Sequence, residues 1–192
     1  MSYTLQPYVG LEPNPIRKEE NENDSEEAYE GETDELFGPD LWGPPLWYAF
    51  HTAAECSDHP AAQHLWPVLL TALDSSGGIP CPECSGHFSA WYRAHPYDIQ
   101  STPSDVQSYM RTWILDLHNN VNRHAEPPTP EWTTESVRAT YGDESSSSRT
   151  AKCMEALAKL TVVDGLVGED VLKQLRTLLQ TVCVDTVNRS VI

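Results

Sequence analysis

Positive charge is scarce in this sequence of 192 residues. Lysine and arginine number 12 against 29 aspartates and glutamates, so the formal net charge is 12 − 29 = −17 at pH 7. A surface that binds nucleic-acid phosphates needs a basic patch, so we expect no nucleic-acid partner. The charge is also uneven, because residues 1–36 hold eleven acidic and two basic residues (2 − 11 = −9), and the remaining 156 residues carry −8.

Three further features are missing. No run of about 18 apolar residues occurs, so we expect no membrane span. The N-terminus has neither the apolar stretch of a secretory signal nor the Arg-rich pattern of a transit peptide, which makes the cytoplasm the expected compartment. No useful stretch alternates apolar and polar residues, as strands would. Because cytoplasmic thiols are normally kept reduced, the five cysteines need an explanation.

The composition divides the chain into three predicted segments. Residues 1–36 are a predicted disordered acidic tail, since Glu12–Glu35 has almost no aliphatic residue to offset the entropy cost of ordering. Residues 37–142 hold all six tryptophans and form the predicted folded domain. Residues 143–192 are predicted to be a linker and a C-terminal helical extension.

Apolar residues of the central segment recur at helical spacing. The spacing predicts helices over 46–54 after a Gly43-Pro44-Pro45 turn, 61–72 closed by Gly77-Gly78, 82–95 stopped by Pro96, a Thr102–Asp105 cap through Val121, and a short helix over 133–141. An all-α fold follows, a four-helix bundle with a short fifth helix. Beyond a polar linker at Ser145–Ser148, amphipathic segments 153–160 and 171–182 predict a C-terminal helical hairpin.

The motif Cys81-Pro-Glu-Cys84 is the most informative feature. Two cysteines three apart at a helix N-terminus lie where free amides and the helix dipole stabilise a thiolate, the form that exchanges disulfides and binds metals. A c-type haem site is excluded because Ser85 stands where haem attachment requires His. A thioredoxin-like site is disfavoured because it needs a βαβ context, and no strand is predicted before or after the motif. A zinc site built from Cys81, Cys84 and His87 stays open, although a second closely spaced ligand pair is lacking.

A redox pair beside a bound cofactor is the other open interpretation. Trp47 and His51 are four residues apart and share one face of the first predicted helix. His118 and Asn122 share a face of the fourth, with Asn119 next to His118. Polar groups beside an apolar stripe need partners when they are buried, and a planar, heteroatom-rich ring with a polar tail would supply them.

Three segments resemble the signatures of the Erv/ALR family of FAD-linked sulfhydryl oxidases: Trp42–His51, Pro80–Phe88 and Leu117–Arg123. They stand in family order and at family separations, and together they cover about Phe37 to Tyr141. The Gly-Pro-Pro variant and small core are similar to members encoded by large DNA viruses. The resemblance implies a helical bundle that holds FAD beside the cysteine pair, oxidises thiols and reduces oxygen to hydrogen peroxide.

The resemblance also implies roles for single residues. Cys81 would exchange with the substrate, and Cys84 would lie next to the flavin. The implied partners are thiol-containing protein substrates, molecular oxygen and a second copy in a homodimer, with no resident metal. The implied setting is the cytoplasm, with a viral factory or virion if the viral resemblance holds, rather than the mitochondrial intermembrane space. The residues matched to FAD binding are Trp47, His51, His118, Asn119 and Asn122.

The chain departs from the family pattern at three places. Pro44 stands where many members have Arg, and Ala125-Glu126-Pro127 replaces a common Leu-Gly-Lys, which leaves Arg123 as the nearest cation for the FAD pyrophosphate. Leu115 stands where cellular relatives carry the first cysteine of a disulfide that staples the FAD end. Another contact must then hold the fifth helix, and the segment Trp132–Tyr141 is the candidate.

Three cysteines lie outside the motif. Cys153 and Cys183 are on the two arms of the predicted hairpin, where they could pair, where one could relay electrons, or where both could be inert buried thiols. We expect Cys56 to face the bundle interior or a subunit contact.

Overall fold

The computed structural model describes residues 38–98, 103–125, 127–142 and 146–188, and these residues form helices and no strand. The acidic tail and the Thr102 end of the predicted cap lie outside the described residues. No described helix combines the length and the apolar character needed to cross a bilayer. The all-α prediction is confirmed. The helices are α1 (Pro39–Glu55), α2 (Ala62–Leu73), α3 (Pro82–Ala94), α4 (Pro103–His124), α5 (Thr134–Tyr141), α6 (Ser146–Val162) and α7 (Glu169–Asn188).

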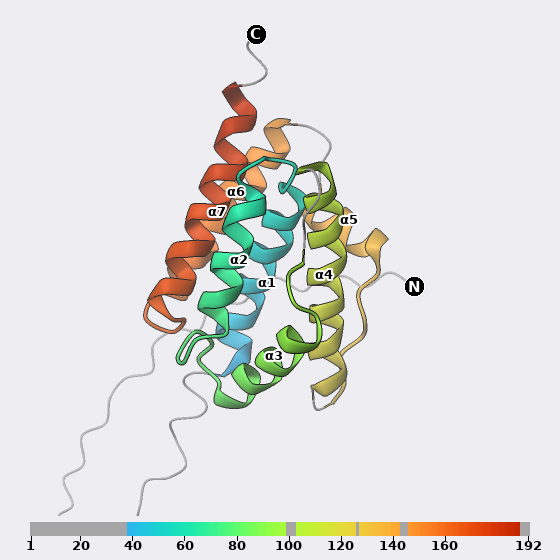
Figure 1. Ribbon diagram of the computed structural model, residues 1–192, viewed down its shortest axis with the longest axis vertical. Helices are drawn as coiled ribbons and strands as arrows, with labels where there is room; N and C mark the ends of the chain where they lie inside the picture. The colour runs from blue at the N-terminus through green and yellow to red at the C-terminus, as the bar shows by residue number, and fades with distance from the viewer. Residues whose placement is uncertain (1–37, 99–102, 126, 143–145, 189–192) are drawn as a thin grey trace, which may run out of the picture. The chain divides into compact units, whose positions relative to one another are not determined.

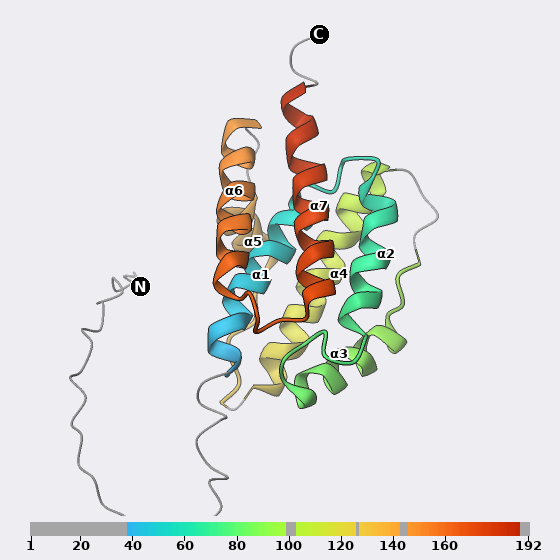
Figure 2. The ribbon, with the colours of Figure 1, turned by 90° about the vertical axis from the view of Figure 1, so that its left-hand side faces the viewer.

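The helices form a bundle covered on one side by a hairpin. In Figures 1 and 2, α1, α2 and α4 run alongside one another, and α3 crosses near the end of the bundle where α1 begins. The short α5 packs on α1 and α4. The last two helices, α6 and α7, pack against each other; α6 lies on α1, and α7 lies on both α1 and α2. The predicted C-terminal hairpin is therefore present and completes the bundle.

The start of α1 corrects one prediction. The Gly43-Pro44-Pro45 sequence does not open the helix as a turn; it lies inside α1, which begins at Pro39. Proline at the first helical position is favourable because its fixed φ suits a helix and its missing N–H would have no partner there. The earlier start buries Trp42 one turn before the buried Leu46. This burial offsets the backbone hydrogen bonds that the two internal prolines remove.

The start of α6 corrects another. The predicted linker at Ser145–Ser148 is largely helical, since α6 already begins at Ser146. Contacts just beyond the serines tie this end to the bundle. Arg149 forms an ion pair with Asp58 at 3.1 Å, and Lys152 Nζ donates to the carbonyl oxygen of Gly142 at 2.7 Å. The serine run alone could not indicate these long-range contacts.

One apolar core runs through the bundle and the hairpin. Trp66 on α2 and Met110 and Ile114 on α4 belong to the same buried cluster as Leu175 and Leu179 on α7. Burying a side chain of this size contributes about 1.5 to 3 kcal/mol relative to leaving it exposed. The hairpin is thus part of the folding unit, although it lies outside the predicted central segment.

Two glycines join the hairpin turn to the loop that precedes α3. The Gly168 amide donates to the carbonyl oxygen of Gly78 at 3.3 Å. A Cβ atom on Gly168 would lie 2.6 Å from the carbonyl oxygen of Gly77, and one on Gly78 would lie 2.5 Å from that of Ala72. Both distances are shorter than atomic contact allows, so the approach of the hairpin turn to this loop requires glycine at 168, and the approach of the loop to the end of α2 requires glycine at 78.

Candidate active site

Cys81 and Cys84 form a disulfide at the N-terminus of α3, with 5.2 Å between their Cα atoms. Cys81 is the N-cap residue in an extended conformation, and its Sγ accepts a hydrogen bond from the Cys84 amide at 3.1 Å. Pro82 occupies the first helical position. Both cysteines are half-buried. The helix N-terminus favours negative charge, so either sulfur is stabilised as a thiolate when the disulfide opens.

Helix α3 is held in place by large side chains and not by close backbone packing. Its backbone approaches no other helix as extensively as the bundle helices approach one another. Phe88 is buried, and Trp91 and Tyr92 each meet Trp113 of α4 edge to face at 6.4 Å. The Trp113 indole N–H donates to the carbonyl oxygen of His95 at 2.9 Å, at the C-terminal end of α3. The helix that carries the cysteine pair is therefore separated from α4 by aromatic rings.

A cluster of rings joins α1, α4 and α5. The Trp47 and His118 rings stack at 4.0 Å between centroids with 7° between their planes. His51 Nε2 lies 2.9 Å from His118 Nδ1, and the His51 ring stacks on Tyr141 at 4.6 Å. Trp132 closes the group at 5.7 Å from His118. Trp47, His51 and His118, which the sequence predicts as binding residues, thus lie together.

Burial keeps the two imidazoles of this cluster neutral. It lowers the pKa of His51 to about 3, with His118 adding to the effect, and lowers the pKa of His118 to about 4. One ring donates and the other accepts in the bond between them. His51 Nδ1 is buried and has no hydrogen-bond partner among the described residues. An unsatisfied buried nitrogen of this kind indicates a place for a ligand atom.

The two asparagines hold the segment that leads into α5. Asn119 bonds the Trp132 backbone twice, donating to its carbonyl oxygen at 2.9 Å and accepting from its amide at 2.8 Å. Asn122 donates to the Pro130 carbonyl oxygen at 3.0 Å. These bonds supply the contact expected to replace the missing staple at Leu115. The carboxamide groups are therefore engaged with the backbone rather than presented to a cleft.

Arg123, the predicted phosphate contact, pairs with Glu131 at 2.7 Å, and both side chains are about half exposed (51 and 52%). An exposed pair of this kind contributes little stability, about 0 to 1 kcal/mol. A phosphate group could therefore exchange with the Glu131 carboxylate at small cost.

Two members of the ring cluster, Trp132 and Tyr141, were not among the predicted site residues. The i, i+4 spacing of Val137 and Tyr141 could have found one of them, since it places both on the buried face of α5. Nothing local singles out Trp132, because the Asn119 bonds that position it come from a distant helix.

The sequence model of the Erv1/Alr family matches residues 44–142, which is 99 of the 192 residues. The chain belongs to the Erv1/Alr family. Its members are thiol oxidases that are generally FAD-linked, and the matched residues include the Cys81–Cys84 pair and every member of the ring cluster. Comparisons with curated proteins and with solved structures give no match. The viral resemblance therefore stays a prediction.

The chemistry of the ring cluster fits FAD. It offers flat aromatic faces, two neutral imidazoles and the unsatisfied Nδ1 of His51, and Trp47 packs against the same apolar core as the cysteine pair. FAD combines a flat heteroaromatic ring with polar edges, which needs both kinds of contact. Because the faces of Trp47, His118, His51 and Tyr141 are stacked on one another, they would have to separate to admit it.

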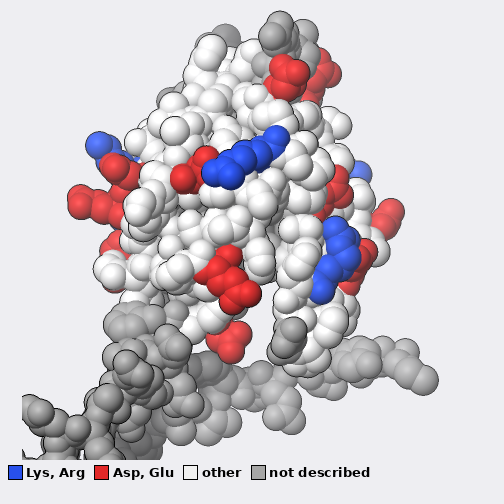
Figure 3. All heavy atoms as spheres, turned by 60° about the horizontal axis from the view of Figure 1, so that its bottom comes forward, with Lys and Arg blue, Asp and Glu red and all other residues white. Residues whose placement is uncertain are grey.

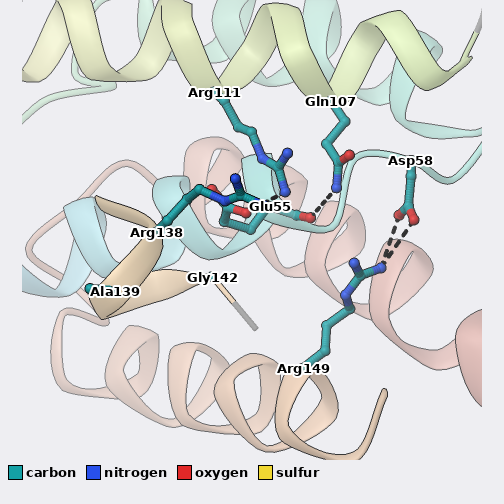
Figure 4. A pocket seen from close by; sticks show the side chains of 8 residues that line it. All are labelled: Glu55, Asp58, Gln107, Arg111, Arg138, Ala139, Gly142 and Arg149. Carbon is teal, nitrogen blue, oxygen red and sulfur yellow. Dashed lines mark hydrogen bonds and ion pairs between the residues drawn. The ribbon is translucent and has the colours of Figure 1, made fainter. Parts of the chain in front are cut away.

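Two cavities among the described residues lie elsewhere. One of about 670 Å³ is lined by charged residues that include Glu55, Arg111 and Arg149 (Figure 4). The other, of about 620 Å³, is lined by residues that include His95 and Asp116. Neither borders the cysteine pair or the stacked rings. We place the site by the disulfide and the unsatisfied imidazole, because cavity size alone says nothing of chemistry.

The zinc alternative finds no support in the geometry. Cys81, Cys84 and His87 do not form a group of converging ligand atoms among the described residues, and the disulfide removes both thiolates. The His87 ring instead lies 5.4 Å from that of His124, at the end of α4.

A second disulfide joins Cys153 on α6 to Cys183 on α7. Both sulfurs belong to the buried core, so a substrate cannot reach them, which disfavours an electron relay. Cys56 faces the interior, as expected, and is 1% exposed. It caps the end of α1 that lies away from α3 in Figures 1 and 2.

Proposed function

We propose that this protein is an FAD-dependent thiol oxidase that forms disulfide bonds in protein substrates and reduces oxygen to hydrogen peroxide. The observation that carries the proposal is the half-buried Cys81–Cys84 disulfide at the N-terminus of α3, within the family-matched residues. It combines access for a substrate thiol with a local field that stabilises thiolates.

The two cysteines perform thiol–disulfide exchange. A substrate thiolate attacks Cys81 Sγ, the Cys81–Cys84 bond breaks, and Cys84 leaves as a thiolate at the positive end of the helix. A second substrate thiolate then attacks the mixed disulfide, which releases the substrate disulfide and Cys81 as a thiolate. The Cys84 amide, which donates to Cys81 Sγ at 3.1 Å, stabilises that charge. Two electrons remain on the pair, now a dithiol.

A bound FAD would supply the two-electron transfer from the dithiol to oxygen, so that two thiols and O₂ would give one disulfide and H₂O₂. Trp47 and His118 would contact it through their ring faces, and His51 through Nδ1. Arg123 would exchange Glu131 for the pyrophosphate. The low pKa of both histidines keeps them neutral, so neither brings a positive charge next to the ring.

The surface near α3 supports a protein substrate of no particular charge. Figure 3 brings this end of the molecule forward, and on its described residues acidic and basic side chains are intermixed, several of them side by side. Among the described side chains on this face, no patch of a single sign would select a charged partner. We therefore propose that the enzyme recognises exposed cysteine thiols rather than a charged motif.

Two further properties belong to the proposal. We propose a homodimer that uses bundle surface other than the side of α1 and α2 covered by α6 and α7. Sedimentation velocity at micromolar concentration measures this, and a single monomer species would contradict it.

We also propose action in the cytoplasm, in a viral factory or virion if the chain is viral, which fractionation of expressing cells tests.

Oxygen uptake with dithiothreitol as the substrate tests the main proposal. Wild type should be yellow, consume oxygen and release peroxide in equal amounts, and Cys84→Ser should lose at least about 100-fold in turnover because the pair can no longer close. Cys56→Ser is the matched control and should keep wild-type turnover. A colourless wild-type protein that binds no FAD, or an active Cys84→Ser variant, would refute the proposal.

A further inference from the structure

Three cysteines meet in the core where α1, α6 and α7 come together. Cys153 and Cys183 form a disulfide, and Cys56 is a free thiol. All three sulfur atoms lie within 4.8 Å of one another, and Cys56 Sγ is 3.7 Å from Cys153 Sγ. A third sulfur in contact with a disulfide is near enough to exchange with it once the side chains turn to bring the attacking sulfur into line with the disulfide bond.

We propose that these three cysteines share one exchangeable disulfide. The Cys56 thiolate attacks Cys153 Sγ, the Cys153–Cys183 bond breaks, and a Cys56–Cys153 bond forms. Cys183 leaves as a thiolate and takes up the proton that Cys56 lost. One disulfide and one thiol are present before and after, so the step needs no oxidant, no reductant and no cofactor.

The exchange changes which parts of the chain are joined. The Cys153–Cys183 bond links α6 to α7 inside the hairpin, across a sequence separation of 30. A Cys56–Cys153 bond would link α6 to α1 across a separation of 97. The hairpin would then be covalently attached to the bundle that carries the candidate active site. The second form therefore closes a much longer loop of the unfolded chain.

The burial of Cys56, modified by nearby charges, controls the rate of this exchange. Burial raises the pKa of the Cys56 thiol to about 12, while Arg149 and Arg111 lower it and Asp58 and Glu55 raise it. These four residues line the cavity of about 670 Å³, where Arg149 donates to both Asp58 carboxylate oxygens at 3.1 Å (Figure 4). Since the thiolate is the nucleophile, exchange is slow at neutral pH and accelerates about tenfold per pH unit below the pKa.

Mapping the free thiol in the folded full-length protein tests the proposal. Wild type is held at pH 7, 8 and 9, quenched with acid, unfolded, alkylated and digested, and the alkylated cysteine is identified by mass spectrometry. Label should move from Cys56 to Cys183 and reach a plateau, about tenfold faster per pH unit. Label that stays on Cys56 alone at every pH and time would overturn the proposal.

Variants separate this exchange from the oxidase chemistry. In a glutathione redox buffer, Cys183→Ser should form the Cys56–Cys153 disulfide, whereas Cys56→Ser should keep Cys153–Cys183 and take up no label at these two cysteines. The Cys81→Ser/Cys84→Ser double variant should exchange at the wild-type rate, because the step needs no electron acceptor. Free Cys56 and Cys153 in Cys183→Ser, or a rate that falls with the double variant, would contradict the proposal.

Discussion

The two disulfides of this chain differ in their surroundings more than in their covalent chemistry. Cys81–Cys84 spans three positions at a helix N-terminus and is half-buried, with a backbone amide donating to one sulfur. Cys153–Cys183 spans 30 positions between two helices, and its sulfurs are inside the core, against a third cysteine. The first has access and a stabilised leaving group. The second is closed to external thiols, so only the adjacent Cys56 can exchange with it, and its longer loop constrains the unfolded chain more strongly.

The comparison explains why a count of cysteines is a poor guide to redox function. Exposure decides whether an external thiolate can reach a sulfur, and the local field decides how well the other sulfur leaves. A helix N-terminus supplies the field at Cys81. Around Cys56, burial outweighs the two nearby arginines and raises the thiol pKa. The same kind of bond is therefore suited to exchange with substrates at Cys81–Cys84 and to stabilising the core at Cys153–Cys183.

Rates of reduction should show the largest difference. Under anaerobic conditions, dithiothreitol should reduce Cys81–Cys84 at least about 100-fold faster than Cys153–Cys183, because only the first is reached without local unfolding. Quenched alkylation and peptide mapping over time measure both rates in one sample. Equal rates in the folded protein would remove the basis of the comparison.

Stability should separate the two disulfides next. The Cys153→Ser/Cys183→Ser variant should lose about 3 to 4 kcal/mol of unfolding free energy, whereas Cys81→Ser/Cys84→Ser should lose about 2, since loop-closure entropy grows with the loop. Urea unfolding measures both. The Cys153→Ser/Cys183→Ser variant should keep its turnover per folded molecule, and the Cys81→Ser/Cys84→Ser variant should lose it. The reverse pattern would mean that Cys153–Cys183 is the catalytic pair.

The pH dependence of stability should show whether the histidines of the ring cluster are neutral in the folded protein. The folded pKa of His118 is about 4, below its unfolded value of about 6.5. Its stabilising contribution is therefore complete above pH 6.5 and is lost as the pH falls from 6.5 to 4. His118→Gln should remove about 3 kcal/mol of the change in unfolding free energy across this window. His64→Gln, at an exposed histidine, is the control, and an unchanged slope in His118→Gln would refute the neutral pair.

The smallest effect should come from the acidic tail. Deletion of residues 1–36 removes −9 of the −17 net charge. Turnover with dithiothreitol should stay within about twofold of wild type at 0.15 M salt, because charges beyond a Debye length are screened. A large loss of turnover would mean that the tail takes part in the chemistry of the cysteine pair.

Local patterns predicted most of the fold. Apolar spacing and caps placed α2, α3 and α5 within a residue or two, and Thr133 indeed caps α5. The errors at Pro44 and at Ser146 share a cause. In each case the local sequence favours a break, and a long-range contact, the burial of Trp42 or the anchoring of α6, extends the helix. Such contacts are absent from any local window.

In the candidate site, too, local patterns predicted some residues and missed those that depend on long-range contacts. The i, i+4 spacing of Trp47 and His51 placed them on one face, and the family signature brought His118 to them. The sequence could not foresee that Asn119 would bind the Trp132 backbone or that Tyr141 would stack on His51. It left the pairing of Cys153 and Cys183 open, because spacing does not fix a disulfide between two helices.

The contact between Gly168 and Gly78 has a consequence for where this enzyme can be cut. Gly168 lies 168 − 142 = 26 positions beyond the last family-matched residue, yet its backbone rests on the loop that delivers Cys81 to α3. A fragment that ends at residue 142 would keep the whole family signature and lose the surface that supports this loop. The family-matched segment, residues 44–142, is therefore shorter than the segment that folds as one unit, which includes the α6–α7 hairpin.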